Sequence, residues 1–212
     1  MAQPDPAPPP VTGRVVLASS NEGKLRELAA LLEPRGFQLV LQSELGIEAP
    51  EETGNTFEDN ALLKARHAAQ LSGLPALADD SGIEVDALDG RPGVWSARYA
   101  GESATDLENL ELMLTELADV PDARRTARYR CVIALVRSAE DPEPLLGSGV
   151  WEGHIATFPR GSGGFGYDPI FLPDGQNGRS AAEMSTQAKN AVSHRARALH
   201  ALLEQLGGPP TP

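Results

Sequence analysis

The sequence predicts an α/β fold in which a mixed β-sheet is covered by helices. Three observations lead to this prediction. Short apolar stretches alternate with segments whose apolar residues recur at helical spacing, which is typical of a sheet packed against helices. Two longer strand-like stretches, at residues 127–137 and 145–157, follow one another directly. A chain of 212 residues, 41% of them hydrophobic, can bury a full core, so we expect one domain over residues 14–207.

The first half of this domain reads as two strands that each lead toward a helix. The predicted elements, in order, are a strand at residues 14–18, a helix with Leu25, Leu28, Ala29 and Leu32 on one face, a strand at residues 37–41, a polar loop at residues 44–55 and a helix from Thr56 to about Gly73. Pro34-Arg35-Gly36 should stop the first helix, and Thr56-Phe57-Glu58-Asp59 has the pattern of a capping box for the second.

The second half is predicted to contain the long hairpin and two further helices. The predicted elements are strands at residues 74–78 and 83–88, a loop at residues 89–93, a helix capped by Thr105 with Leu107, Leu110, Leu114 and Leu117 buried, strands at residues 127–137 and 145–157, a glycine-rich segment at residues 161–169, a short strand at residues 170–172, and a helix from about Ser193 with Leu199, Leu202, Leu203 and Leu206, closed by Gly207. The two long strands are of similar length, so we expect them to pair as a hairpin.

Composition excludes several classes of protein. A net charge of −12 and a pI near 4.7 argue against a surface that coats nucleic acid. Cys131 is the single cysteine, so no internal disulfide or cysteine-based zinc cluster is expected, which fits a reducing cytoplasm. No apolar run approaches the ~20 residues of a membrane span. Residues 1–13 read as a disordered Pro-rich tail and residues 208–212 as a frayed end.

The turn Ser19-Ser20-Asn21-Glu22-Gly23-Lys24 lies between a predicted strand and a predicted helix. Backbone N–H groups and the positive end of the helix dipole converge at such a point, so the turn can bind an anion such as phosphate. It is not a Walker A loop, because Ala18 and Leu25 replace the first Gly and the Ser/Thr of that motif. An ordinary strand-to-helix turn is the alternative.

Two acidic pairs, Glu51-Glu52 and Asp79-Asp80, are candidates for a magnesium site. Mg²⁺ is usually held by one or two carboxylates together with substrate phosphates and water. On a strand, adjacent side chains point to opposite faces, so Asp79 and Asp80 should have different roles. The alternatives are a solvated acidic loop for the first pair and a polar turn for the second, because Asp-Ser-Gly is ordinary turn composition.

Three further features are compatible with a ligand site. The glycines of Gly163-Gly164-Phe165-Gly166-Tyr167-Asp168 allow close approach of the backbone, and an exposed aromatic ring can stack on a base. A hairpin loop with a core aromatic residue is the alternative. Lys189 and His194-Arg195 could donate hydrogen bonds to a ligand or be surface charge. Lys64 forms a polar stripe on its helix with Asn60 and His67. On its own, this stripe favours a solvated face over a ligand site.

Taken together, these segments resemble the inosine triphosphate pyrophosphatase family. The segments that carry the resemblance, in order, are Ser19-Ser20-Asn21-Glu22-Gly23-Lys24, Glu51-Glu52-Thr53-Gly54, Asn60-Ala61-Leu62-Leu63-Lys64-Ala65, Ala78-Asp79-Asp80-Ser81-Gly82, Gly93-Val94-Trp95-Ser96-Ala97-Arg98-Tyr99, Gly163-Gly164-Phe165-Gly166-Tyr167-Asp168-Pro169 and Ser193-His194-Arg195. Each is a weak signal alone, but together they span nearly the whole chain in the family's order. The resemblance implies an elongated mixed sheet flanked by helices and a homodimer.

The resemblance also implies a function and a role for each motif. The chain would hydrolyse inosine, deoxyinosine and xanthosine triphosphates to the monophosphate and pyrophosphate, with Mg²⁺ as cofactor. The implied triphosphate site is Ser19, Ser20, Asn21, Glu22, Gly23 and Lys24, with added charge from Lys64 and Lys189; the implied metal ligands are Glu51 and Asp80; the implied base site is Phe165, Gly166, Tyr167, Asp168, His194 and Arg195. Asp80 would also orient or deprotonate the water, Asp79 would support it, and Ser81 would touch the substrate.

Two alternative functions stay open from the sequence. A pyrophosphatase for other nucleotides, such as modified pyrimidines, would share the phosphate chemistry and differ in the base pocket. A nucleotide sensor without catalysis is a second alternative, although a mere binder of polyphosphate gains little from four nearby carboxylates. The sequence does not choose between Glu51 and Glu52 as the second metal ligand, and it does not explain how guanine is excluded.

Overall fold

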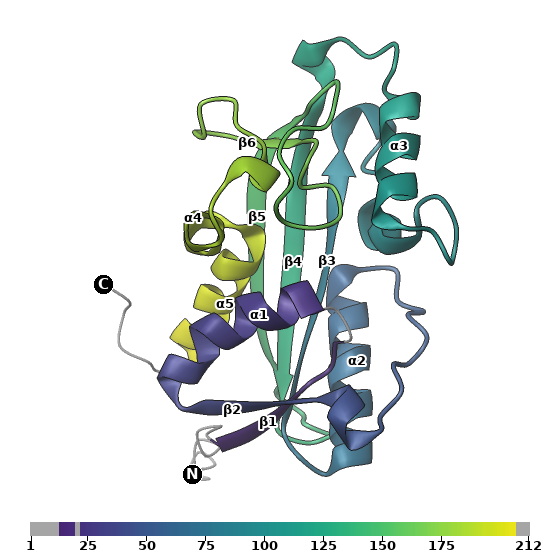
Figure 1. Ribbon diagram of the computed structural model, residues 1–212. Coiled ribbons are helices and arrows are strands. Elements are labelled where there is room, and N and C mark those ends of the chain that lie inside the picture. Colours follow the sequence, from purple (N-terminus) through teal and green to yellow (C-terminus); the bar gives the residue numbers. More distant parts are fainter. Residues whose placement is uncertain (1–12, 20–21, 207–212) are drawn as a thin grey trace, which may run out of the picture.

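The computed structural model describes residues 13–19 and 22–206, and its centre is one six-stranded mixed sheet (Figure 1). The strands are β1 (Gly13–Leu17), β2 (Phe37–Leu41), β3 (Ala76–Val85), β4 (Thr126–Val136), β5 (Leu145–Ile155) and β6 (Phe171–Pro173). Their order is β2-β1-β3-β4-β5-β6, with β1 parallel to β2 and β3 and the other neighbours antiparallel. The prediction of an elongated mixed sheet is confirmed, because β3, β4 and β5 run along most of the molecule.

Helices cover both faces of the sheet. The helices are α1 (Glu22–Leu32), α2 (Phe57–Ser72), α3 (Asp106–Glu116), α4 (Thr186–Val192) and α5 (His194–Gln205). Helices α1 and α5 lie against one face and α2 lies against the other, while α3 lies near the far end of the long strands (Figure 1). None of these helices is long and apolar enough to cross a membrane, over the residues that the structure describes.

Most predicted elements are confirmed, and their ends follow local chemistry. Strands β4 and β5 pair antiparallel over ten residue pairs, as the hairpin prediction requires. Thr56 caps α2, because its side chain accepts a hydrogen bond from the Asp59 N–H, and Thr105 and Glu108 form a complete capping box at α3. At α5 the Ser193 side chain caps the helix start, whereas the predicted closing residue Gly207 lies outside the described residues.

Two predictions about local structure are wrong, and one helix is additional to those predicted. Residues 74–78 and 83–88 are not two strands around a turn, since β3 runs without interruption through Asp79 and Asp80. Hydrogen bonding to β4 and ion pairs from neighbouring helices hold these polar residues in the strand. Leu107 is 60% exposed, and Met113 is buried in its place. Helix α4 was not predicted from the sequence.

Alternation along β3 distributes its residues between two cores. Leu77 packs with α1 and α5 in one core, and Ala76 and Ala78 pack with α2 in the other. The same alternation continues through the two carboxylates, so Asp79 lies on the α1/α5 side and Asp80 on the α2 side.

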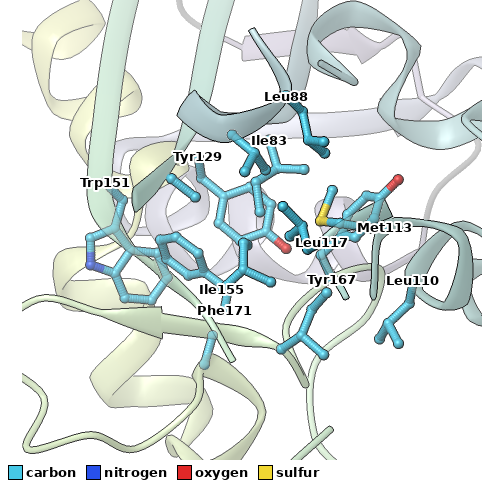
Figure 2. Packing of buried hydrophobic residues seen from close by; sticks show 14 residues of the cluster. Ile83, Leu88, Leu110, Met113, Leu117, Tyr129, Trp151, Ile155, Tyr167 and Phe171 are labelled. Carbon is cyan, nitrogen blue, oxygen red and sulfur yellow. The ribbon is translucent and has the colours of Figure 1, made fainter. Parts of the chain in front are cut away.

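A third core closes the far end of the long strands. It combines aromatic residues of β4, β5 and β6 with aliphatic residues of β3 and α3 (Figure 2). The ring of Phe171 meets the rings of Tyr129 and Trp151 edge-on, at centroid distances of 4.7 and 5.4 Å. Edge-to-face contacts of this kind add stability beyond the area that they bury. Tyr167 of the glycine-rich segment and the adjoining Ile170 belong to this core.

Helix α5 lies unusually close to β5. A Cβ atom on Gly147 would be 2.1 Å from the Ala198 carbonyl oxygen, and one on Gly149 would be 2.2 Å from that of His194. No larger residue fits at either position without moving the helix. The two glycines therefore set the position of α5, and with it the position of His194 and Arg195.

Candidate active site

The two aspartates of β3 are both buried and have separate sets of partners. Asp79 is 1% exposed and Asp80 is 5% exposed. An isolated buried carboxylate is strongly disfavoured, so each needs cations or hydrogen-bond donors. The expectation that the two side chains point to opposite faces is confirmed by the partners described next.

Asp79 is held by two cations from the α1/α5 side. Its Oδ2 lies 3.1 Å from Lys24 Nζ and 3.2 Å from Arg195 Nε. Burial alone would raise the pKa of Asp79, but the charges of Lys24 and Arg195 outweigh it and hold the pKa well below its ordinary value. Asp79 is therefore an ionised anchor between the starts of α1 and α5.

Asp80 is held from the α2 side. Its Oδ1 lies 2.6 Å from Lys64 Nζ, and its Oδ2 accepts a longer hydrogen bond of 3.4 Å from Asn60 Nδ2. Burial raises the pKa of Asp80, and the charge of Lys64 only partly offsets that effect. Asp80 is thus the better proton acceptor of the two aspartates.

The residues of the α2 stripe are not solvated, contrary to the expectation from that stripe alone. Asn60 is fully buried and Lys64 is 8% exposed, because both turn toward β3. Only His67 lies toward the surface, where its Nε2 is 3.0 Å from the Glu48 carbonyl oxygen. Helical spacing alone could not show that a polar stripe faces a buried carboxylate.

Glu52, the second residue of the first acidic pair, contacts the same lysine as Asp80. Its Oε1 lies 2.8 Å from Lys64 Nζ and its Oε2 lies 3.0 Å from Arg98 Nη1. Burial would raise the pKa of Glu52, but the Lys64 charge and the hydrogen bonds from Lys64 and Arg98 lower it. Glu51 is exposed, so its role as a metal ligand stays a prediction.

The arrangement of Glu52 and Asp80 suits a divalent cation. No group of three or more His, Cys, Asp or Glu side chains gathers within residues 13–19 and 22–206 in a way that could hold a metal by itself. Magnesium does not need such a group when substrate phosphates and water complete its shell. Glu52 and Asp80 both direct an oxygen at the Lys64 ammonium, so they already converge on one positive charge.

The predicted phosphate turn has the expected surroundings. Strand β1 ends at Leu17 and α1 begins at Glu22, so a strand is followed within a few residues by a helix. Ser19 is half-buried, and Lys24 lies in the first turn of α1. Ser20 and Asn21 lie outside the described residues, and the side chain of Glu22 is not described.

A pocket of about 110 Å³ is lined by Lys24 and Arg195, the two cations that hold Asp79. The residues that line it include predicted members of both the phosphate and the base sites: Lys24, Ser81, Phe165, Gly166, Tyr167, Asp168, Lys189, His194 and Arg195. The structure therefore brings together side chains from α1, β3, the glycine-rich segment, α4 and α5. Lys64 and Glu52 do not line this pocket, since they lie on the α2 side.

A buried ion pair shapes the glycine-rich wall of the pocket. Asp168 Oδ2 lies 2.6 Å from Lys189 Nζ and accepts a 2.9 Å hydrogen bond from the Phe165 N–H. Gly164 has φ +71°, and a Cβ atom there would lie 2.0 Å from Asp168 Oδ2. Glycine is therefore required for the turn that places Phe165 at the pocket, with Lys189 Nζ 4.7 Å from its ring centroid.

The start of α5 forms the opposite wall. The His194 ring stacks on Tyr129 at 4.6 Å with an interplanar angle of 8°. Arg195 donates from Nε to Asp79 and from Nη2 to Ser81 Oγ at 3.1 Å. Arg195 therefore contacts both Asp79 and Ser81, which lines the pocket.

Nearly the whole chain is similar to proteins of one family. The model of the Ham1 family matches residues 15–205. The chain belongs to the Ham1 family. Proteins named dITP/XTP pyrophosphatase are 55% identical over 193 residues in Shigella flexneri, which is 91% of this chain and 98% of that protein, and 56% identical over 194 residues in Photorhabdus laumondii, with the same coverage. The resemblance found in the sequence is thereby confirmed.

Solved Ham1 structures share the fold. A HAM1 protein from Coxiella burnetii has a TM-score of 0.84 and 49% identity, and covers 93% of this chain and 99% of its own. The Ham1 protein of Staphylococcus aureus has a TM-score of 0.80 and 38% identity, with 92% and 98% covered. The Ham1 fold thus extends over almost the entire chain.

Sequence reasoning assigned no role to several residues that shape the site of this Ham1 protein. Arg98 holds Glu52, the Ser96 carbonyl accepts a 2.8 Å hydrogen bond from the Tyr167 hydroxyl, and Tyr129 stacks on His194. Ser96 and Arg98 belong to a motif that carried the family resemblance, so their positions were flagged without a function. Tyr129 gave no signal, because a buried tyrosine in a strand is ordinary.

Proposed function

We propose that the chain hydrolyses non-standard purine nucleoside triphosphates, namely inosine, deoxyinosine and xanthosine triphosphates, to the monophosphate and pyrophosphate. The observation that carries this proposal is the similarity, over nearly the full length, to proteins named dITP/XTP pyrophosphatase. The site supplies chemically suitable groups. Cationic side chains line the pocket, and the carboxylates of Glu52 and Asp80 meet at Lys64 on the α2 side of β3.

In the proposed reaction a water molecule attacks the α-phosphorus. A new P–O bond forms, the bond to the α,β-bridging oxygen breaks, and pyrophosphate leaves. Asp80 accepts the proton of the attacking water, a role that suits a carboxylate whose pKa is raised by burial. Lys24 and Lys64 lie on the two sides of β3. Their positive charges would stabilise the negative charge that develops on the leaving pyrophosphate.

Magnesium is the proposed cofactor. When bound, it would neutralise charge on the phosphates. Asp80 and Glu52 would hold it, because these two carboxylates converge on one cation, whereas Glu51, the residue expected from the sequence, is exposed. Lys64 would then contact phosphate oxygens as well as the carboxylates.

The pocket gives a physical reason for base preference. Hypoxanthine and xanthine carry an acceptor at position 6, whereas adenine carries an amino donor. The Arg195 guanidinium at the pocket wall carries donors and no acceptor, so it can donate to a 6-oxo group but offers nothing to the amino group of adenine. Mismatches of this kind can discriminate between bases by ~10⁴.

We also propose, from the family resemblance, that the enzyme is a cytoplasmic homodimer. The net charge of −12 disfavours nucleic acid as a partner.

The test is pyrophosphate release from a panel of purine and pyrimidine triphosphates, with and without Mg²⁺. We expect release from the inosine and xanthosine compounds only with Mg²⁺, and we expect Asp80→Asn to lose nearly all turnover. Glu84→Gln, on the same strand but paired with Arg128 and Arg130 rather than with Lys64, is the matched control and should keep its rate. Binding without release would favour a sensor, and unchanged turnover in Asp80→Asn would refute the assigned role.

A further inference from the structure

Arg98, at the end of a short helix, contacts the acidic residue Glu52. It is the last residue of the 3₁₀ helix Gly93–Arg98. Its Nη1 lies 3.0 Å from Glu52 Oε2, and its Nη2 lies 3.4 Å from the backbone oxygen of the same residue. One guanidinium thus contacts both the side chain and the main chain of Glu52, which constrains the loop as well as the carboxylate.

The second carboxylate oxygen of Glu52 is held separately. Oε1 lies 2.8 Å from Lys64 Nζ, and the same ammonium lies 2.6 Å from Asp80 Oδ1. Charges therefore alternate in sign along the series Arg98, Glu52, Lys64, Asp80. Because each oxygen of Glu52 has its own cation, the plane of this carboxylate is fixed relative to Asp80.

Arg98 is itself fixed relative to β3. Its guanidinium carbon lies 4.4 Å from the centroid of the Trp95 ring, which supports one face of the group. Within the same short helix, Ser96 Oγ accepts a 2.9 Å hydrogen bond from the Ile83 N–H of β3. A Cβ atom on Gly82 would lie 2.2 Å from the Gly93 carbonyl oxygen, so the helix packs directly on the strand that carries Asp80.

We propose that Arg98 is a positioning residue, which orients Glu52 so that its carboxylate and that of Asp80 can hold one divalent cation. The proposal rests on the proposed function, since it assumes that these carboxylates bind the metal. Arg98 touches neither Asp80 nor the pocket on the other side of the sheet. Any effect of Arg98 on the geometry of the two carboxylates therefore passes through Glu52.

A purely electrostatic role predicts the opposite effect on metal affinity. Arg98 is a positive charge close to the cation site, so its removal would strengthen the attraction of a divalent cation if Glu52 did not move. If Arg98 instead orients Glu52, its removal weakens metal binding. Changes in the residues that orient metal ligands typically cost 10–100-fold in affinity or activity. The direction of the change separates the two roles.

The experiment compares Arg98→Gln and Arg98→Lys with the unaltered protein. The readouts are Mn²⁺ binding without nucleotide, followed by electron paramagnetic resonance, and the Mg²⁺ concentration that gives half of the maximal rate. We expect about tenfold weaker binding for Arg98→Gln. Arg98→Lys should be intermediate, because it keeps the charge but cannot contact both atoms of Glu52. The KM for inosine triphosphate at saturating Mg²⁺ should change much less.

Arg91 provides a matched control on the same segment. It pairs with Glu116 at 3.2 Å and does not contact Glu52. Arg91→Gln and Arg91→Lys should leave Mn²⁺ affinity unchanged. In addition, Arg98→Gln should have little further effect in a Glu52→Gln background if Arg98 acts through Glu52.

The outcomes also separate this proposal from the proposed function. Equal or tighter Mn²⁺ binding by Arg98→Gln, in an enzyme that still needs Mg²⁺, would overturn the positioning role and leave the function intact. A protein that releases pyrophosphate from no triphosphate and binds no Mn²⁺ would overturn both. A loss of affinity that is the same in the presence and absence of the Glu52 carboxylate would also overturn the positioning role.

Discussion

The two faces of β3 treat the same chemical group in opposite ways. Asp79 and Asp80 are adjacent and similarly buried, yet neighbouring charges hold the pKa of Asp79 well below its ordinary value while burial raises that of Asp80. Lys24 and Arg195 both contact one oxygen of Asp79, whereas Asp80 shares the single cation Lys64 with a second carboxylate. The number of cations for each acid, rather than the depth of burial, decides the difference.

The comparison suggests a division of roles between the faces. On the α1/α5 face, Asp79 pairs with Lys24 and Arg195, and these ion pairs fix two helices and one pocket wall. On the α2 face, two acids face one ammonium, so a further cation can be accommodated there. Substitutions on the first face should therefore chiefly change stability and ligand binding, and those on the second should chiefly change the chemical step.

The largest expected effect is on stability. Asp79→Asn should lower the free energy of unfolding by about 3–5 kcal/mol, because it removes the carboxylate that the buried Arg195 and the half-buried Lys24 share. Asp80→Asn should cost only about 1 kcal/mol, since Lys64 keeps Glu52 and the amide oxygen can still accept a hydrogen bond. Urea denaturation at pH 7 measures both. Equal losses for the two variants would contradict the division.

The sequence predicted the contrast between the two acids but not its cause. Strand alternation requires adjacent side chains to diverge, and this holds whether or not the partners are known. The continuity of β3 is not predicted because Asp-Ser-Gly has the composition of a turn, and pairing with β4 together with ion pairs from distant segments keeps it extended. Local pattern contains no information about those segments.

The same limit explains which site residues were found. Lys24, Arg195 and the glycine-rich segment were identified because each stands in a motif with a local mechanism, such as a helix start or a tight turn. The residue pattern alone predicts a solvated position for Lys64, because its partner Asp80 is 16 positions away. The contact between Arg98 and Glu52 spans 46 positions, so neither could indicate the other.

A smaller effect should separate ligand binding from anchoring on the α1/α5 face. Lys24 both contacts Asp79 and lines the pocket, so Lys24→Ala should weaken binding of a non-hydrolysable inosine triphosphate analogue by about tenfold, or about 1.4 kcal/mol. Calorimetric titration measures the affinity. Arg26→Ala, an exposed position on the same helix, is the control and should bind normally. Unaltered affinity in Lys24→Ala would count against its role in the phosphate site.

The smallest effect expected concerns His194, which is buried on the same face as Asp79. Burial lowers its pKa well below the ordinary value of 6.5, and the charges of Arg195 and Lys189 lower it further, while Asp79 opposes them only in part. The folded chain therefore keeps His194 neutral below pH 6.5, whereas the unfolded chain binds a proton. Stability should consequently fall as the pH falls.

Replacement of His194 by phenylalanine tests this expectation. Stacking on Tyr129 is retained, and Nδ1 has no hydrogen-bond partner in the part of the chain that the structure describes, so few contacts are lost. Between pH 7 and 5.5, His194→Phe should lose about 1 kcal/mol less stability than the unaltered protein. Denaturant unfolding at the two pH values gives the difference. If both proteins lost the same amount, His194 would be protonated in the folded state, and the α1/α5 face would accept a further positive charge beside Arg195.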